Sequence, residues 1–327
     1  MSDIYHIPQD NGVDYRLKKF VEYQHEVPSI HYRFLGDYIK KYKLPKDEAI
    51  TLCWYMSITY NEVTCILLRE LLRDATEEEV WERFKPCLNF GSARKYAKNN
   101  DMFVQLIKDW KTLTKGDPVN WLLSLNAEEG EKTFKNIQRD LNSVRNCGRF
   151  ASDLFLETAT YLKDYIGINI KEPFTLDWKN CANLTSGIFN IFYEDERANE
   201  FDRTKKISEL DKRYLTQKLK VIQTAIRSTY PEQNSEVSMF IGKICSFRNL
   251  FKAARYGGFH HDRQLGVIKQ YQKDLPEKQK LWEECYELRQ EIFPNRLLGE
   301  LHGWDGIRKE RKKLWLTTGF TGVEEGV

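Results

Sequence analysis

Residues 207–230 decide the fold class, and they read ISELDKRYLTQKLKVIQTAIRSTY. Within them the apolar residues Leu215, Leu219, Ile222 and Ile226 follow one another at spacings of four, three and four. An α-helix turns once every 3.6 residues, so this spacing places the four side chains in one stripe. The stretch therefore predicts a helix that packs through one face.

Helical signals continue along most of the chain. Thr76 with Glu79 three residues later is typical of a capping box, and Asp117 before Pro118 marks another helix start. The segment FKNIQRDLNSV, residues 134–144, repeats the helical spacing, whereas convincing strand alternation is absent. We therefore predict a mainly α, multi-helical globular fold.

Turn residues in TLTKGDPVN, residues 112–120, separate two helical groups. They predict an N-terminal helical part over residues 1–115 and a C-terminal helical part over residues 116–327 that carries the functional site. The chain of 327 residues is long enough for these parts to pack closely or to form one domain.

Composition limits the class of protein. The formal charge is only +3, from 51 Lys and Arg against 48 Asp and Glu, so bulk charge does not identify a nucleic-acid binder. The seven cysteines are dispersed without a Cys-x-x-Cys pair, which favours reduced thiols inside a cell. The start of the chain lacks a signal-peptide pattern, and the apolar run at residues 49–61 is shorter than the ~20 residues of a spanning helix. We expect no membrane partner.

The motifs of several familiar enzyme classes are missing. The sequence contains no Walker loop, G-x-G-x-x-G, H-E-x-x-H, nucleophile elbow or paired-cysteine zinc pattern. His260 and His261 are adjacent, and neighbouring side chains on a helix point about 100° apart, so they do not form a metal site by themselves. We assign no metal ligand.

The segment RNCGRFASD, residues 145–153, lies at a predicted helix junction. If Gly148 ends one helix in the left-handed conformation and Arg149 opens the next, free backbone N–H groups would converge with two guanidinium groups, those of Arg145 and Arg149. That arrangement predicts an anion site. The alternative is a glycine C-cap with Arg145 favourably placed near the helix C-terminus and Arg149 solvated.

The segment AARYGGFHHDRQ, residues 253–264, has the same pattern. Asp262 is placed to cap a helix that begins at Arg263 and Gln264. The segment gathers imidazole, carboxylate, guanidinium and aromatic groups suited to a planar, phosphorylated substrate. They are Arg255, Tyr256, Phe259, His260, His261, Asp262, Arg263 and Gln264. The alternative is a tight connection with exposed polar residues.

Two acidic segments complete the candidates. Asp177 and Trp178 lie at a predicted helix start, where Asp177 is either an N-cap or a base. Glu194, Asp195 and Glu196 form either a solvated loop or the carboxylate set that Mg²⁺ would need beside a pyrophosphate.

Three segments in this order resemble one known family: VRNCGRFASDLFLETATYL, YGGFHHDRQ and GELHGWDGIRKERKKLWLTTG. The family is that of bacteriophage amino acid:DNA transferases, also called α-glutamyl/putrescinyl thymine pyrophosphorylases. The resemblance covers most of the chain, and the Gly148-Arg149-Phe150 and Asp262-Arg263-Gln264 triplets carry most of it.

The resemblance implies a step in thymine hypermodification. A kinase pyrophosphorylates 5-hydroxymethyluracil in double-stranded phage DNA, and an amino acid or polyamine then displaces the pyrophosphate, in the cytoplasm of the infected bacterial host. The family has been likened to helical DNA glycosylases. No h-x-G-x-G hairpin is found here, so we expect the glycosidic bond to stay intact.

The chemistry of this step gives each candidate a role. Arginines or Mg²⁺ would stabilise the leaving pyrophosphate, an imidazole or carboxylate would accept the amine proton, and an aromatic ring would stack on the extruded base. The predicted catalytic residues are Arg149, Asp177, His260, His261, Asp262 and Arg263. The predicted substrate-binding residues are Arg145, Phe150, Trp178, Arg255, Tyr256, Phe259 and Gln264.

Two other classes of protein remain open. A helical DNA-binding or glycosylase-like protein would use the same residues without amine transfer, and a structural helical adaptor would use none of them. The basic segments KKYK, residues 40–43, and RKERKK, residues 308–313, either bind DNA phosphates or form solvated helix faces.

Overall fold

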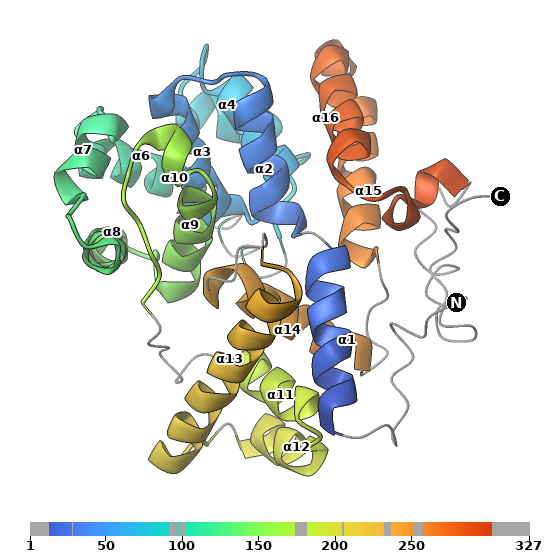
Figure 1. Cartoon of the computed structure of the whole chain (residues 1–327). Coiled ribbons are helices and arrows are strands. Elements are labelled where there is room, and N and C mark those ends of the chain that lie inside the picture. Colours follow the sequence, from blue (N-terminus) through green and yellow to red (C-terminus); the bar gives the residue numbers. More distant parts are fainter. Residues whose placement is uncertain are drawn as a thin grey trace. The chain divides into compact units, whose positions relative to one another are not determined.

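The computed structural model in Figure 1 describes residues 13–27, 29–91, 94, 97, 102–173, 182–204, 206–231, 237–251 and 258–302. Every regular element in these ranges is a helix, so the predicted mainly α, multi-helical fold is confirmed. No helix in the part that the structure describes is both long enough and apolar enough to cross a bilayer.

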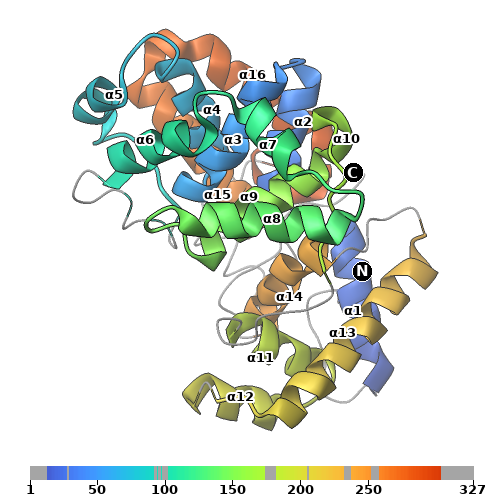
Figure 2. The same cartoon turned by 90° about the vertical axis from the view of Figure 1, so that its left-hand side faces the viewer.

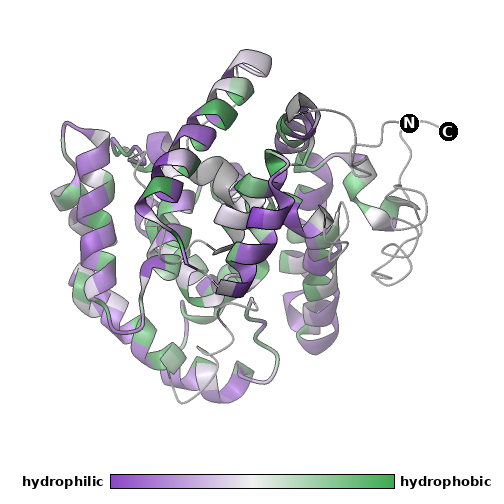
Figure 3. Cartoon of the chain, turned by 90° about the horizontal axis from the view of Figure 1, so that it is seen from below, coloured by the Kyte–Doolittle hydropathy of each residue, from purple (hydrophilic) through white to green (hydrophobic). Residues whose placement is uncertain are grey.

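The stretch that predicted the fold forms helix α13 (Glu209–Thr229). Its N-cap Ser208 and Asp211 form a capping box, and the predicted stripe of Leu215, Leu219, Ile222 and Ile226 is buried. Figure 3 shows hydrophilic and hydrophobic residues on the same helices, as expected where each helix buries one face.

The other predicted helix starts are also found. Helix α5 (Glu77–Phe84) begins after Thr76 with the capping box to Glu79. Helix α7 (Pro118–Leu125) begins after Asp117, whose side chain accepts the Asn120 N–H at 2.9 Å. Helix α8 (Gly130–Ser143) buries its predicted apolar positions.

The chain divides into two compact units. Unit 1 comprises Met1–Ser29, Pro173–Arg263 and Phe293–Val327, and unit 2 comprises Ile30–Glu172 and Gln264–Ile292. The predicted boundary between residues 115 and 116 differs from this division, because it falls inside unit 2. The turn there, with left-handed Lys115 and Gly116, only ends helix α6 (Met102–Thr114).

Unit 1 is built from segments that are distant in the sequence. Helix α1 (Val13–Glu26) packs against α13 and α14 (Val237–Phe251), and α11 (Ala182–Ile191) packs against α12 (Asp195–Thr204) and α14. Phe20 meets Phe247 edge to face at 5.3 Å in its core. A Cβ on Gly187 would lie 2.5 Å from the Ile244 side chain, so this glycine permits the close approach of α11 to α14.

Unit 2 is organised around α3 (Lys46–Thr59), which contains most of the apolar run noted in the sequence. Helices α4 (Glu62–Leu71), α6, α7 and α9 (Arg149–Tyr161) pack against it, as Figure 2 shows for α4, α6 and α7. A helix that is covered on several sides is apolar on all of its faces. The packing of α3 inside unit 2 therefore accounts for the apolar run at residues 49–61. The stacked rings of Trp54 and Trp110, 5.1 Å apart, fill its core.

Further helices complete unit 2. Helix α2 (Ile30–Lys41) packs against α4, α9 and α16 (Gln279–Ile292). The division between the units falls inside α15 (Phe259–Asp274), whose first residues belong to unit 1 and the rest to unit 2. Among the described residues, the shorter elements of unit 2 are α10 (Lys163–Ile166) and the 3₁₀ helix Pro276–Lys278, and those of unit 1 are the 3₁₀ helices Asn295–Leu297 and Gly299–His302.

Candidate functional site at the start of helix α9

The junction at residues 145–153 differs from the prediction in one respect. Gly148 does not end a helix in the left-handed conformation; its φ of −76° and ψ of 179° are extended, and it is the N-cap of α9. The left-handed residue is Asn146, at φ 64°, because asparagine tolerates this conformation. The carbonyl of Gly148 accepts the Ala151 N–H at 2.9 Å. Arg149 opens the second helix, as predicted.

The two arginines of this junction lie in different surroundings. Arg149 Nε is 3.3 Å from Asp153 Oδ2, one turn further along α9, whereas Arg145 is exposed. Gly148 has no side chain to cap the helix, so the first N–H groups of α9 have no side-chain partner from their N-cap residue. The helix start therefore combines a guanidinium group with backbone donors.

Phe150 is the exposed aromatic of the junction, with 45% of its surface accessible. Its ring meets the ring of Tyr60 edge to face, at 5.3 Å and 88°. Tyr60 ends α3 in the left-handed conformation, at φ 49°, and donates its N–H to Met56 O at 2.9 Å. Because a Cβ on Gly91 would lie 2.4 Å from the Tyr60 carbonyl oxygen, a side chain at residue 91 would displace Tyr60.

The Tyr60 ring also contacts an imidazole–carboxylate pair. The centroid of the His31 ring lies 4.6 Å from that of Tyr60, and His31 Nδ1 is 2.8 Å from Glu62 Oε2. His31 is the second residue of α2, and Glu62 is the first residue of α4. The side chain of His31 is 19% exposed, whereas Glu62 is buried with 4% of its surface accessible.

Gln264, a predicted substrate-binding residue, also contacts Glu62. The buried Gln264 donates its Nε2 to Glu62 Oε1 at 2.8 Å. Burial by itself would raise the pKa of Glu62, but the charge and hydrogen bond of His31, the backbone N–H and the Gln264 hydrogen bond outweigh it and lower the pKa. Glu62 is therefore an ionised carboxylate at neutral pH. Glu62 lies in the first turn of α4, where the positive end of the helix dipole also favours that charge.

A second cation lies near the junction. Arg94 is buried and donates to the Ile58 carbonyl oxygen at 3.4 Å. Burial lowers the pKa of Arg94 to about 10, and burial raises the pKa of the Cys147 thiol to about 12, while each group shifts the other toward its charged form. Arg94 thus adds positive charge beside the residue that precedes Gly148. Arg94 is not among the residues predicted for the site.

The junction at residues 253–264 corrects another prediction. Helix α15 begins at Phe259, so Asp262 does not cap a helix that starts at Arg263; it lies within the first turns and donates its N–H to Gly258 O at 2.9 Å. The reason is that Gly258, at φ 82°, already makes the left-handed turn ahead of Phe259.

The imidazoles of α15 contact aromatic rings. His261 is buried and meets Phe293 edge to face at 4.6 Å, and His260 meets Phe259 in the same way at 5.4 Å. Asp262 is buried and Arg263 is partly exposed. The packing of the buried His261 ring against Phe293 is the arrangement of a core histidine.

The structure brings some predicted residues together. Arg149, Phe150 and Gln264 belong to unit 2, where Tyr60, His31 and Glu62 connect Phe150 to Gln264 through successive contacts. The segment from Phe259 to Arg263 belongs to unit 1. A shared pocket of Arg149 with residues 260–263 therefore stays a prediction. Asp177, Trp178, Arg255, Tyr256 and the segment at residues 308–313 lie outside the described residues.

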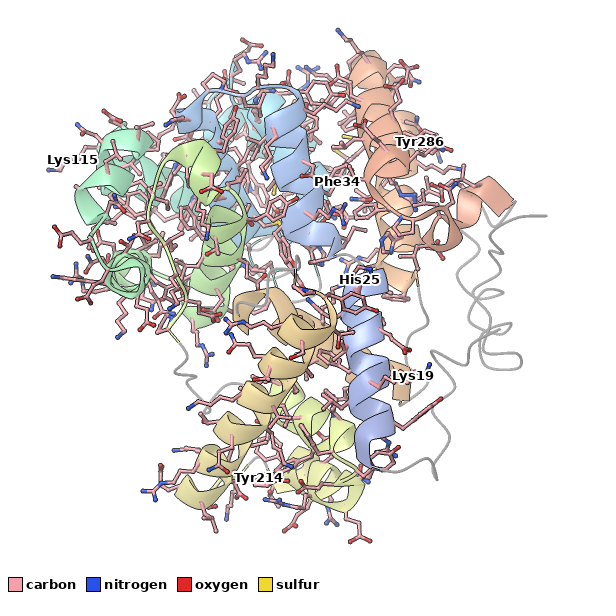
Figure 4. The ribbon with its side chains drawn as sticks, viewed as in Figure 1. Lys19, His25, Phe34, Lys115, Tyr214 and Tyr286 are labelled. Atoms are coloured by element: carbon pink, nitrogen blue, oxygen red, sulfur yellow. The ribbon has the colours of Figure 1, made fainter. Side chains whose placement is uncertain are left out.

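The acidic run after α11 is occupied by ion pairs. Asp195 accepts hydrogen bonds from both Nη1 and Nη2 of Arg16. Glu194 pairs with Arg197 and accepts a hydrogen bond from the hydroxyl of Tyr214, which is labelled in Figure 4. In the part of the chain that is described, no cluster of three or more His, Cys, Asp or Glu could hold a metal ion.

The lysines of residues 40–43 also have local partners. Lys40 lies 4.1 Å from the Tyr161 ring centroid, and Lys41 pairs with Glu291. Both lysines lie in the last turn of α2, and a DNA contact by KKYK stays a prediction.

His31, Glu62 and Tyr60 are not among the residues predicted for the site. No motif marks them, because His31 and Glu62 are thirty-one positions apart and meet only when α2 packs against α4. Of the residues around Glu62, Gln264 was predicted as a substrate-binding residue, but its hydrogen bond to the Glu62 carboxylate was not predicted.

Comparison with known proteins finds no family model, no curated protein and no solved structure that matches the chain. The mainly α fold and the geometry at α9 accordingly come from the structure itself.

Proposed function

We propose that this chain is a DNA-modifying transferase. It would displace pyrophosphate from pyrophosphorylated 5-hydroxymethyluracil with an amino acid or amine and produce a hypermodified thymine, in the cytoplasm of an infected bacterium. The proposal starts from the resemblance carried by the triplets of residues 148–150 and 262–264. The observation that supports it best is the exposed Phe150 ring at the start of α9.

Phe150 suits a site for a planar base. Nearly half of this large apolar side chain is accessible, while its neighbour Tyr60 holds it edge to face at 5.3 Å. A base extruded from duplex DNA needs an aromatic surface on which to stack, and such stacking contributes about 1–3 kcal/mol per base.

Arg149, the residue before Phe150, suits the leaving group. Its pairing with Asp153 at 3.3 Å is an i, i+4 contact on a helix surface, which is worth only about 0.3–0.5 kcal/mol. A pyrophosphate with several negative charges can replace Asp153 as its partner and also accept hydrogen bonds from the N–H groups that open α9.

The decisive experiment uses the full-length protein with pyrophosphorylated 5-hydroxymethyluracil DNA and a mixture of amino acids. We expect free pyrophosphate and a nucleoside whose mass has risen by the attached amine, measured by nucleoside mass spectrometry. Abasic sites would favour a glycosylase-like protein instead. Intact substrate would favour a DNA-binding protein or an adaptor.

Two alanine variants test the stacking role. Phe150→Ala should weaken use of the substrate about 5- to 150-fold, the equivalent of the lost stacking energy. The control is Leu123→Ala on α7 of the same unit, since Leu123 is exposed to a similar extent, 47%. Equal activity of the two variants would count against Phe150 as the stacking surface.

A further inference from the structure

We infer that His31 is the proton acceptor of the amine transfer and that Glu62 is its positioning residue. The inference rests on the proposed function for the identity of the substrate, a primary amine that attacks a pyrophosphorylated pyrimidine. We call His31 and Glu62 the dyad.

The hydrogen bond fixes which ring nitrogen can accept a proton. An ionised carboxylate only accepts hydrogen bonds, so His31 Nδ1, 2.8 Å from Glu62 Oε2, carries the proton of that bond. In a neutral imidazole the lone pair then resides on Nε2. This is the arrangement in which a buried carboxylate orients a histidine base and stabilises the imidazolium that forms.

The dyad lies next to the proposed base-stacking surface. One ring, Tyr60, contacts both His31 at 4.6 Å and Phe150 at 5.3 Å. His31 remains partly accessible to solvent while Glu62 is buried. A proton can thus enter and leave at the imidazole, and the charge that favours it is shielded from water.

Gln264 holds the other carboxylate oxygen. It donates to Glu62 Oε1, so both oxygens of Glu62 are held by neighbouring side chains. The amide oxygen of Gln264 has no hydrogen-bond partner among the described residues, although it is buried. A buried acceptor without a donor is rare in a folded protein, and it could take an N–H from a bound substrate.

Other titratable groups around α2 stay in one protonation state or lie further along the helix. Burial raises the pKa values of the Cys65 and Cys285 thiols, which interact with the charge of Glu62, so both stay neutral near pH 7. The groups around Tyr38 lie about two turns from His31. The helices packed on α2 contribute Cys65, Arg69, Glu70, Tyr161, Glu284, Cys285 and Glu291.

The proposed step balances as follows. The amine nitrogen forms a bond to the 5-methylene carbon, the carbon–oxygen bond breaks, and its electron pair stays on the departing pyrophosphate. The proton that the new ammonium group loses moves to His31 Nε2, and the imidazolium is stabilised by Glu62. General base catalysis of this kind contributes about 10²- to 10⁴-fold in rate.

The test separates proton acceptance from a structural role. In His31→Asn the amide nitrogen can still donate to Glu62, but no group can take a proton. We expect a single-turnover rate about 10²- to 10⁴-fold lower, unchanged DNA affinity and loss of the acid limb of the pH–rate profile. Imidazole added to His31→Ala should restore part of the rate.

The matched control is His25→Asn in unit 1. His25 is exposed and stacks on Tyr230 at 3.8 Å, and Figure 4 labels it at the end of α1. This variant should keep the wild-type rate. A His31→Asn protein that transfers amine at the wild-type rate, or a His31→Ala protein that imidazole does not rescue, would overturn the inference.

A second measurement keeps the dyad testable apart from the proposed function. A wild-type protein that transfers no amine to the modified DNA would overturn the proposed function. The reactivity of His31 is measured independently of that function, by carbethoxylation with diethyl pyrocarbonate followed by peptide mass spectrometry. We expect His31 to react in the native protein. In the pH range where the rate no longer rises with pH, so that neutral imidazole is the reacting form in both proteins, it should react more slowly in Glu62→Gln. Equal reaction in both proteins would overturn the inference.

Discussion

Replacing Glu62 by glutamine perturbs the carboxylate that joins three helices of unit 2. Its oxygens lie 2.8 Å from His31 Nδ1 on α2 and 2.8 Å from Gln264 Nε2 on α15. A glutamine has the same shape but only one acceptor, so its NH₂ group must face one of these two donors. If that NH₂ group faces Gln264, a buried donor keeps no partner; if it faces His31, the imidazole must move its proton from Nδ1 to Nε2. Both arrangements lose the hydrogen bonds to a charged acceptor.

The size of the effect follows from these contacts. A hydrogen bond to a charged group contributes about 1.5–3 kcal/mol, and a buried donor left without a partner costs about 1–3 kcal/mol. We expect Glu62→Gln to lower the free energy of unfolding by about 2–4 kcal/mol at pH 7. Glu48→Gln is the control, because Glu48 pairs with Arg69 while 32% exposed, and such pairs contribute under about 1 kcal/mol.

The effect should depend on pH in one direction. The pKa of Glu62 is lower in the folded protein than the value near 4.3 expected in the unfolded chain, so its stabilisation is present above about pH 4.3. It is lost as the pH falls through the folded-state pKa. The protonated carboxyl and the amide then make similar bonds, and the stability difference between wild type and variant should shrink.

Urea unfolding at several pH values between 3 and 8, followed by tryptophan fluorescence and far-UV circular dichroism, measures this difference. Comparison with the variant isolates Glu62, because all other acids titrate in both proteins. A variant as stable as the wild type at pH 7 would refute the reasoning. So would a difference that grows as the pH falls below about 4.3, because it would mean that Glu62 is uncharged in the folded protein.

Three further predictions follow from α9. Gly148→Ser should stabilise the protein by about 0.5–1 kcal/mol in thermal unfolding, because the N-cap is extended, uncapped and has open space around a Cβ. Glu157→Gln should raise the melting temperature at pH 7 but not near pH 4. Burial and the charges of Asp153 and Glu172 raise the pKa of Glu157 in the folded protein. Glu157 therefore destabilises the folded protein only as the pH rises above the pKa of an unfolded-chain glutamate. Arg149→Lys should keep the melting temperature but lower the single-turnover rate about 10²- to 10³-fold, since lysine lacks the planar two-pronged donor.

The helices could be predicted because their signals are local. The stripe from Leu215 to Ile226 and the caps at Thr76 and Asp117 lie within single helices, and the structure confirms each of them. The two units could not be predicted in the same way. Unit 1 combines segments from the start, middle and end of the chain, and turn residues mark helix ends whether or not a unit ends there.

Residues of the candidate site could be predicted only where several of them are close together in the sequence. Arg149 and Phe150 follow a glycine at a predicted helix junction, and this local pattern marks them as candidates. The predicted left-handed conformation of Gly148 was wrong, because Asn146 makes the left-handed turn. His31 and Glu62 carry no local pattern. Their hydrogen bond arises from the packing of α2 on α4, which no spacing in the sequence encodes.

Two features around Tyr60 oppose stability, and they adjoin the buried charge of Glu62; this coincidence is the strongest physical argument for function. The pairing of Glu62 with His31 stabilises the fold as it stands, although apolar packing of similar volume is often equally stable or better. Tyr60 itself is left-handed, a conformation that costs a residue with a Cβ about 1–2 kcal/mol. Phe150 exposes an aromatic ring that the fold could have buried. Successive contacts join all three, and departures from local stability that cluster in this way are typical of sites selected for chemistry.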